Sequence, residues 1–317
     1  MLQTAGNLLA RSRAAGRICV INYHRVLQTH HPLLPSEPDV ATFRWQMELL
    51  ARCFNVLPLR QALALMDAGT LPPRSVCITF DDGYSAVHEL ALPVLQRFNL
   101  PATVFVTSGH LGQNTMWNDR IIEAVQSLRT ERLDLRGLGL ANYSLRNTDE
   151  RLAAIGALTE HSKYLPPSKR QSLIRQLEEM AGENLVPGQM LTPDMVRALD
   201  RNGIEIGAHT VTHPILTSMD DESAQSEITS SKHQLEELLG KPVQLFAYPN
   251  GKVGKDYDTR HVDMVRRAGY AAAFTTAVGA ITKEQDRFQL PRSRPWDRTP
   301  FMFGLRLLSW MAQGPPR

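Results

Sequence analysis

Cysteine, basic runs and long apolar segments are all scarce in this 317-residue chain. The three cysteines, Cys19, Cys53 and Cys77, are odd in number and lie in apolar segments. We interpret them as buried thiols of a reducing compartment, because a disulfide framework needs an even set. Lysine and arginine never occur more than two in a row and the formal net charge is only +3, so nucleic-acid binding is not indicated.

The two ends of the chain carry few targeting features. No apolar run reaches the roughly 18 residues that a transmembrane helix needs. Residues 1–16 lack a charged start followed by a long apolar core, so we expect no cleaved secretion signal and a cytoplasmic protein. Residues 300–312 predict an apolar C-terminal helix with one Arg. Two interpretations stay open: a helix packed on the domain, or a segment for peripheral contact with a membrane or a partner.

Short apolar, β-branched runs alternate with amphipathic helical stretches along most of the chain. This alternation is typical of an α/β fold with a parallel sheet or barrel. We expect strands at residues 18–23, 55–57, 76–80, 103–107, 204–208, 245–248 and 271–275. We expect helices near residues 42–53, 59–68, 86–98, 193–202, 223–239 and 258–268.

Residues 117–190 interrupt this alternation. They hold charged helical stretches at residues 119–129 and 149–183, joined by polar links and without a convincing strand. We interpret them as a helical insertion in one catalytic domain that spans residues 1–317. A lid or substrate wall and a purely structural role both stay open for it.

Two fragments with metal-binding chemistry each follow a predicted strand. Asp81 and Asp82 directly follow the apolar run at residues 75–80, and His209 and His213 follow the run at residues 204–208. Sites in α/β folds are built at the carboxyl ends of strands. Two His and one Asp form a facial ligand set for a divalent ion, and a second Asp beside it can serve as a base. Taken singly, each fragment is more often an ordinary loop, so the inference depends on their co-occurrence.

These fragments resemble a known family. The strings TFDDG at residues 79–83 and HTVTHP at residues 209–214 are similar to the first two motifs of the polysaccharide deacetylases, carbohydrate esterase family four. The resemblance implies an α/β fold, a distorted (β/α) barrel with fewer than eight strands. It also implies a metal-dependent amidase in which Asp82, His209 and His213 bind the ion and Asp81 is the general base. The ion is usually Zn²⁺ in this family, with Co²⁺, Ni²⁺ and Mn²⁺ as alternatives.

The chain departs from the family's third motif, which usually supplies an Arg that orients the base. The string FAYPNG at residues 246–251 has no Arg, so Arg292 or Arg294 is the candidate partner of Asp81. We expect the backbone N–H of Tyr84 to contact the oxyanion, and Trp296 to stack on a sugar ring. The other residues expected to contact the substrate are Tyr248, Pro249 and Asn250.

The family's C-terminal Leu-x-His motif, which carries the general acid, is also missing. The N-terminal strand instead ends in Tyr23-His24, which resembles the circularly permuted subgroup of poly-N-acetylglucosamine deacetylases. That resemblance implies His24 as the general acid; a core histidine at a strand end is the alternative. We interpret the four histidines in helical or loop contexts as bystanders: His88, His110, His161 and His233.

The function predicted from these residues is removal of N-acetyl groups from an amino sugar in a glycan or glycan precursor. The predicted partner is an N-acetylated sugar, oligosaccharide or lipid-linked glycan, and the missing secretion signal favours an intermediate at the inner membrane face. Three alternatives stay open: an amidase on a non-sugar amide, a catalytically silent glycan-binding module, and an assembly protein of a glycan-export complex.

Overall fold

The computed structural model describes residues 16–112, 115–182, 190–294 and 297–312. The chain divides into two compact units. Unit 1 comprises Met1–Thr29, Ser36–Gly112 and Leu191–Arg317, and unit 2 comprises His30–Pro35 and Gln113–Met190.

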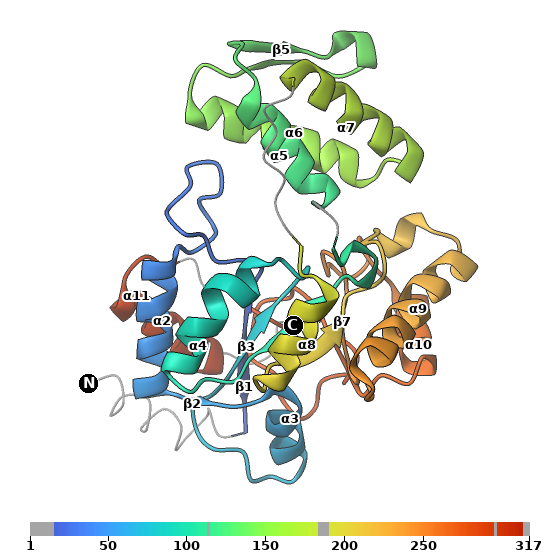
Figure 1. Ribbon diagram of the computed structural model, residues 1–317. Helices are drawn as coiled ribbons and strands as arrows, with labels where there is room; N and C mark the ends of the chain where they lie inside the picture. The colour runs from blue at the N-terminus through green and yellow to red at the C-terminus, as the bar shows by residue number, and fades with distance from the viewer. Residues whose placement is uncertain (1–15, 113–114, 183–189, 295–296, 313–317) are drawn as a thin grey trace. The chain divides into compact units, whose positions relative to one another are not determined.

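A curled parallel sheet forms the centre of unit 1 (Figure 1). Its strands run in the order β1 (Ile18–Tyr23), β3 (Ser75–Phe80), β4 (Thr103–Val106), β7 (Glu205–Ala208), β8 (Leu245–Ala247) and β9 (Ala272–Phe274), and β2 (Asn55–Val56) pairs with β3. Isolated bridges join Phe274 to Leu290 and Ser293 to Ile21, so the segment after β9 reaches back to β1. The sheet is thus an α/β barrel with fewer than eight strands, which confirms the predicted fold class.

Helices surround the outside of this sheet (Figure 1). They are α2 (Val40–Cys53), α3 (Leu59–Asp67), α4 (Leu92–Arg97), α8 (Pro193–Arg201), α9 (Asp221–Leu239), α10 (Thr259–Arg267) and α11 (Pro300–Ala312). The helix predicted at residues 86–98 is split, because it begins as a π-helical turn over Val87–Ala91 before α4. All the other strands and helices predicted for unit 1 are present, with ends that differ by a few residues.

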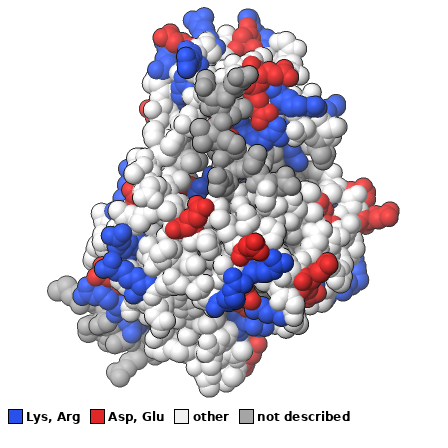
Figure 2. Space-filling model, in the orientation of Figure 1, with Lys and Arg blue, Asp and Glu red and all other residues white. Residues whose placement is uncertain are grey.

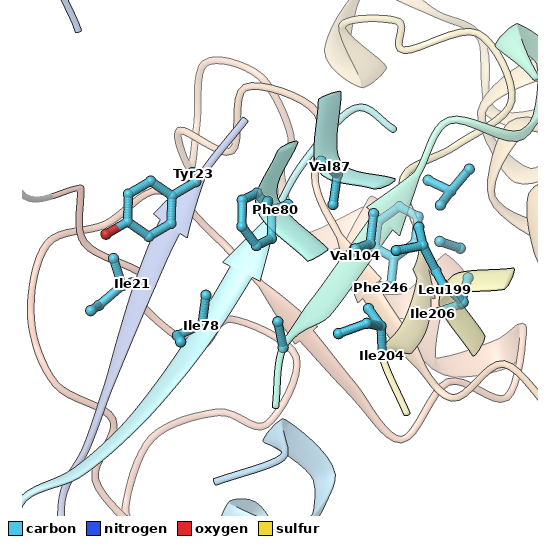
Figure 3. Close-up of a cluster of buried hydrophobic side chains, with 14 of the residues drawn as sticks. Ile21, Tyr23, Ile78, Phe80, Val87, Val104, Leu199, Ile204, Ile206 and Phe246 are labelled. Carbon is cyan, nitrogen blue, oxygen red and sulfur yellow. The ribbon is translucent and has the colours of Figure 1, made fainter. Parts of the chain in front are cut away.

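Apart from the half-buried β2, the strands of unit 1 are largely buried on both faces, which explains their nearly continuous apolar sequences. Figure 3 shows side chains of one face, among them Ile21, Phe80 and Phe246, gathered between the sheet and its helices. Tyr23 of β1 packs on Phe80 of β3 with ring centroids 5.5 Å apart. This core fixes the strand ends where the predicted site residues lie.

Helix α11 packs on α2, where the rings of Phe303 and Trp45 meet edge to face. Its outer side leaves Phe301, Met302 and Leu305 largely exposed. Among the described residues, the structure contains no helix with both the length and the apolar character to cross a membrane.

Unit 2 has a hydrophobic core of its own. Its helices are α5 (Trp117–Ser127), α6 (Thr148–Lys163) and α7 (Pro167–Ala181), with an antiparallel hairpin of β5 (Arg132–Asp134) and β6 (Asn142–Ser144). The hairpin was not predicted, because strands of three residues carry too short a pattern. The helical stretch predicted at residues 149–183 forms two helices, because Pro166 cannot continue α6; its last residue, Glu183, lies outside the described residues.

Candidate active site

The carboxylate pair follows β3 in a tight turn. The N–H of Asp81 still donates to Tyr23 O of β1 at 2.9 Å, as in a continued ladder. Asp82 and Gly83 then adopt positive φ angles of 74° and 91°. An Asp tolerates this left-handed region better than most residues and a Gly adopts it freely. This turn lets the two adjacent carboxylates face different partners.

The two histidines lie on the loop after β7, which we name the histidine loop (residues 209–213). The N–H of His209 donates to Val106 O at 3.0 Å and so extends the ladder between β7 and β4. Thr210 and His213 then take positive φ angles of 63° and 55°. The hydroxyl of Thr210 accepts the N–H of His213 at 3.1 Å. This compact loop, and not a helix, brings the imidazole rings together, with centroids 4.9 Å apart.

Asp82, His209 and His213 converge on one small space. Asp82 Oδ1 lies 3.4 Å from Nε2 of each histidine, and the three potential ligand atoms lie within 4.8 Å of one another. Oδ1 is buried and has no hydrogen-bond partner among the described residues. A buried carboxylate oxygen that faces only two ring nitrogens suits a divalent cation. The donor set therefore fits the ion that the family implies.

Burial and the neighbouring charges shift the pKa values of these three groups in different directions. Nδ1 of His209 lies 2.8 Å from Ala247 O, which fixes the ring and leaves Nε2 as the ligand atom. Burial would raise the pKa of Asp82, but the adjacent imidazole of His209 and the charges of His24 and His213 hold it well below its usual range. Burial lowers the pKa of His213 to about 3 despite the charge of Asp82. Burial would likewise lower the pKa of His209, but the charges of Asp81 and Asp82 raise it.

Asp81 forms a buried, bidentate ion pair with Arg292. Nη1 and Nη2 of Arg292 donate to Oδ1 and Oδ2 at 2.6 and 2.7 Å. Asn22 of β1 adds a bond from Nδ2 to Oδ2 at 3.0 Å. Burial would raise the pKa of Asp81, but the guanidinium lowers it overall. Of the two arginines that the sequence offered, Arg292 thus takes the place beside Asp81.

Arg294 has a different partner. It forms an ion pair with Glu37 and donates to Ser36 O at 3.4 Å. Burial would raise the pKa of Glu37, but the charges of Arg294 and His24 lower it overall.

His24 lies at the end of β1, half-buried beside the carboxylates. Its positive charge opposes the effect of burial on the pKa values of both Asp81 and Asp82. Nδ1 of His24 is buried and makes no hydrogen bond to a described residue. This contradicts a histidine tied to the backbone through Nδ1. The general-acid role stays a prediction.

The predicted substrate residues have different environments. Tyr248 is fully buried, stacks on Tyr257 with centroids 3.9 Å apart and donates to Phe288 O at 3.0 Å. The ring of Tyr248 thus belongs to the core in this structure, and its contact with substrate stays a prediction. Pro249 is also buried. Asn250 is half-buried, and its Nδ2 has no partner among the described residues, which is compatible with its prediction.

Two further predictions concern Tyr84 and Trp296. The Tyr84 ring is buried under the guanidinium of Arg25, which lies 3.9 Å from the ring centroid and donates to the phenolic oxygen at 3.0 Å. The role of its backbone N–H stays a prediction. Trp296 lies outside the described residues.

Four residues of the site escaped the sequence analysis. Asn22 and Glu37 are partners of Asp81 and Arg294, and no local pattern announces such pairs. His110, interpreted as a bystander, is near the ligands: burial lowers its pKa, against the charge of Asp82. Glu227 of α9 binds the histidine loop. The one sequence signal for this contact was that Glu227 lies on the predicted helix that follows the HTVTHP string.

Residues 68–273 match the model of the polysaccharide deacetylase family. This stretch is more than half of the chain and holds both carboxylates and both histidines, whereas His24 and Arg292 lie outside it. The chain belongs to the polysaccharide deacetylase family and is a hydrolase of the deacetylase type.

Individual relatives agree with this assignment. The poly-beta-1,6-N-acetyl-D-glucosamine N-deacetylase of Staphylococcus epidermidis is 26% identical over 211 residues, which cover 59% of this chain and 70% of the relative. The Streptococcus pyogenes deacetylase PplD, solved with acetate, is similar in fold with a TM-score of 0.60 and 19% identity, over 93% of this chain and 98% of PplD. IcaB from Ammonifex degensii is similar in fold with a TM-score of 0.59 and 18% identity, over 94% of this chain and 97% of IcaB.

Proposed function

We propose that this protein is a metal-dependent deacetylase that removes N-acetyl groups from an amino sugar in a glycan or glycan precursor. The observation that carries the proposal is the convergence of Asp82, His209 and His213 beside the Asp81–Arg292 pair. A ligand set with a separate, ionised carboxylate next to it is the equipment of metal-assisted hydrolysis.

The reaction follows from the positions of these groups. A divalent ion held by Asp82, His209 and His213 would polarise the acetyl carbonyl and make a water molecule more acidic. Asp81 removes a proton from the attacking water, and Arg292 keeps the carboxylate ionised and oriented for that step. His24 donates a proton to the leaving amine, and the backbone N–H of Tyr84 stabilises the oxyanion. The products are acetate and a free amino sugar.

The substrate class is supported by the relatives' names. The staphylococcal relatives are N-deacetylases of poly-beta-1,6-N-acetyl-D-glucosamine, so an N-acetylglucosamine polymer, oligosaccharide or lipid-linked precursor is the substrate proposed here. The complete set of ionisable groups disfavours a catalytically silent module. One carboxylate and two imidazoles suit Zn²⁺ first, and they also suit Co²⁺, Ni²⁺ or Mn²⁺.

Acetate release from N-acetylglucosamine oligomers tests the proposal. We expect release by the purified chain with added Zn²⁺ and loss of release with a chelator. His213→Ala should lose both metal occupancy and activity, because a site with two protein ligands binds metal poorly. His233→Ala, on the exposed side of α9, is the matched control and should keep both. Full metal occupancy in His213→Ala would overturn the ligand assignment.

A further inference from the structure

The histidine loop is an unusual backbone for a ligand-bearing segment. Two of its five residues, Thr210 and His213, have positive φ angles without being glycine. Each such conformation costs on the order of a kcal/mol and persists only where the surroundings hold it. The position of His213 therefore depends on contacts that fix the loop.

One side of the loop is held by the short 3₁₀ turn Ser108–His110 after β4. The N–H groups of Ser108 and Gly109 donate to the carbonyls of Thr210 and Val211 at 3.2 and 2.9 Å. The approach is close, since a Cβ on Gly109 would lie 2.7 Å from Val211 O. These bonds satisfy the carbonyls of Thr210 and Val211, whereas the N–H groups of Val211 and Thr212 need another partner.

The other side of the loop is held by a single carboxylate, Glu227 of α9. Its Oε2 accepts the N–H groups of Val211 and Thr212, both at 2.8 Å. Its Oε1 accepts the hydroxyl of Thr212 at 2.7 Å. Hydrogen bonds to an ionised carboxylate are among the strong ones, and three of them converge on two adjacent residues.

We propose that Glu227 is a positioning residue that holds the histidine loop in its left-handed conformation and thereby presents His213 to the metal ion. This inference rests on the proposed function, because it assumes that His213 is a ligand. It adds a residue that touches neither metal nor substrate and acts through the backbone of the loop. Groups behind metal ligands commonly change metal affinity by about 10–100-fold when removed.

Metal affinity of the folded full-length apoprotein is the decisive measurement. Glu227→Ala should bind Zn²⁺ about 10–100-fold more weakly than wild type. With Co²⁺ as the probe, its visible absorption should also change, because His213 is displaced. Glu237→Ala is the matched control, since Glu237 is exposed on the same helix. It should leave affinity and spectrum unchanged.

Two conservative variants separate the effect of the length of the Glu227 side chain from the effect of its charge. Glu227→Gln keeps an oxygen for the two N–H groups, and its NH₂ can donate to the Thr212 hydroxyl, so it should restore affinity close to that of wild type. Glu227→Asp keeps the charge but is one methylene shorter, so it should bind metal weakly. It also serves as the informative variant if Glu227→Ala does not fold.

The outcomes are distinguishable. A purely structural role would lower the apoprotein Tm of Glu227→Ala or Glu227→Asp and leave their Zn²⁺ affinity and Co²⁺ spectrum unchanged, which would overturn this inference alone. Failure of the wild-type chain to bind Zn²⁺ or Co²⁺ would overturn both this inference and the proposed metal site.

Discussion

Asp81 and Arg292 form the most completely buried ion pair of the described site, with side chains that are 4% and 0% exposed. Such a pair is a weak source of net stability, because desolvation offsets the attraction. Its value here is in orientation and charge. The fork of Arg292 fixes both carboxylate oxygens, and its charge lowers the pKa of Asp81 against the effect of burial.

Replacing Arg292 by Met should therefore change the pH dependence of activity. Loss of the guanidinium raises the pKa of Asp81, and the base works only when it is deprotonated. The acidic limb of the pH–rate profile should then move to higher pH. Arg294→Met is the matched control and should move that limb less, since Arg294 pairs with Glu37. Equal movement in the two variants would reject a specific role for Arg292.

His24→Ala tests the proposed general acid. General acid catalysis typically contributes about 10²–10⁴-fold, so turnover of an N-acetyl sugar should fall by that range with metal content unchanged. The loss should shrink for an aryl acetate, whose phenolate leaves without a proton. Turnover of both substrates by wild type and variant gives the comparison. Equal losses would assign His24 a supporting role without proton delivery.

At the scale of elements, the sequence predicted most of unit 1. Fully buried strands such as residues 18–23 and 75–80 carry continuous apolar patterns that few other structures produce. The ligand set was also predictable, because each fragment follows such a strand. The turn at Asp82 and Gly83 follows from local chemistry, because Asp tolerates and Gly freely adopts a positive φ angle. The partners Asn22, Glu37 and Glu227 were not predictable, since these pairs depend on contacts between distant elements. The burial of the Tyr248 ring was not predictable either, because a strand-end aromatic can face the groove or the core.

Gly207 of β7 illustrates how tightly the elements pack beneath the site. A Cβ at this position would lie 2.5 Å from Cδ1 of Phe105 on the neighbouring strand β4. The guanidinium of Arg292 also lies over the Phe105 ring, 5.0 Å from its centroid. The orientation of Asp81, the proposed general base, is thus linked through Arg292 to β4, a strand that contributes no proposed catalytic group.

Gly207→Ala should lower the free energy of unfolding by about 1–3 kcal/mol, because overpacking forces a ring or a strand to move. Chemical denaturation measures the change. Gly156→Ala is a useful comparison, since its Cβ would meet nothing within 4 Å in the middle of α6. It should stabilise by about 0.5–1 kcal/mol. A neutral effect of Gly207→Ala would mean that β4 and β7 separate without cost.

At the scale of the whole molecule, the proposed site residues are all in one of the two units. Every proposed catalytic and ligand residue that the structure describes lies in unit 1, whereas unit 2 has its own buried core from α5 to α7. Positive and negative side chains are interspersed on the face in Figure 2, as the small net charge suggests.

Metal binding should consequently protect one unit selectively. A ligand that binds only the folded state stabilises it by about 2.7 kcal/mol at a hundred times its Kd. Hydrogen exchange with and without Zn²⁺ should slow at the ends of β3 and β7 and stay unchanged in the core of unit 2. Uniform slowing across α5, α6 and α7 would show that the units do not open independently.

The bridge from Ser293 to Ile21 pairs two segments that are made at very different times during synthesis of the chain. His24 is among the first described residues to leave the ribosome and Arg292 among the last, yet both flank the same carboxylate pair. Parallel pairings between such distant segments form slowly. A nascent chain that already contains Asp82, His209 and His213 still lacks Arg292, whose guanidinium orients Asp81. The base that we propose is therefore oriented only after Arg292 has been made and the barrel has closed.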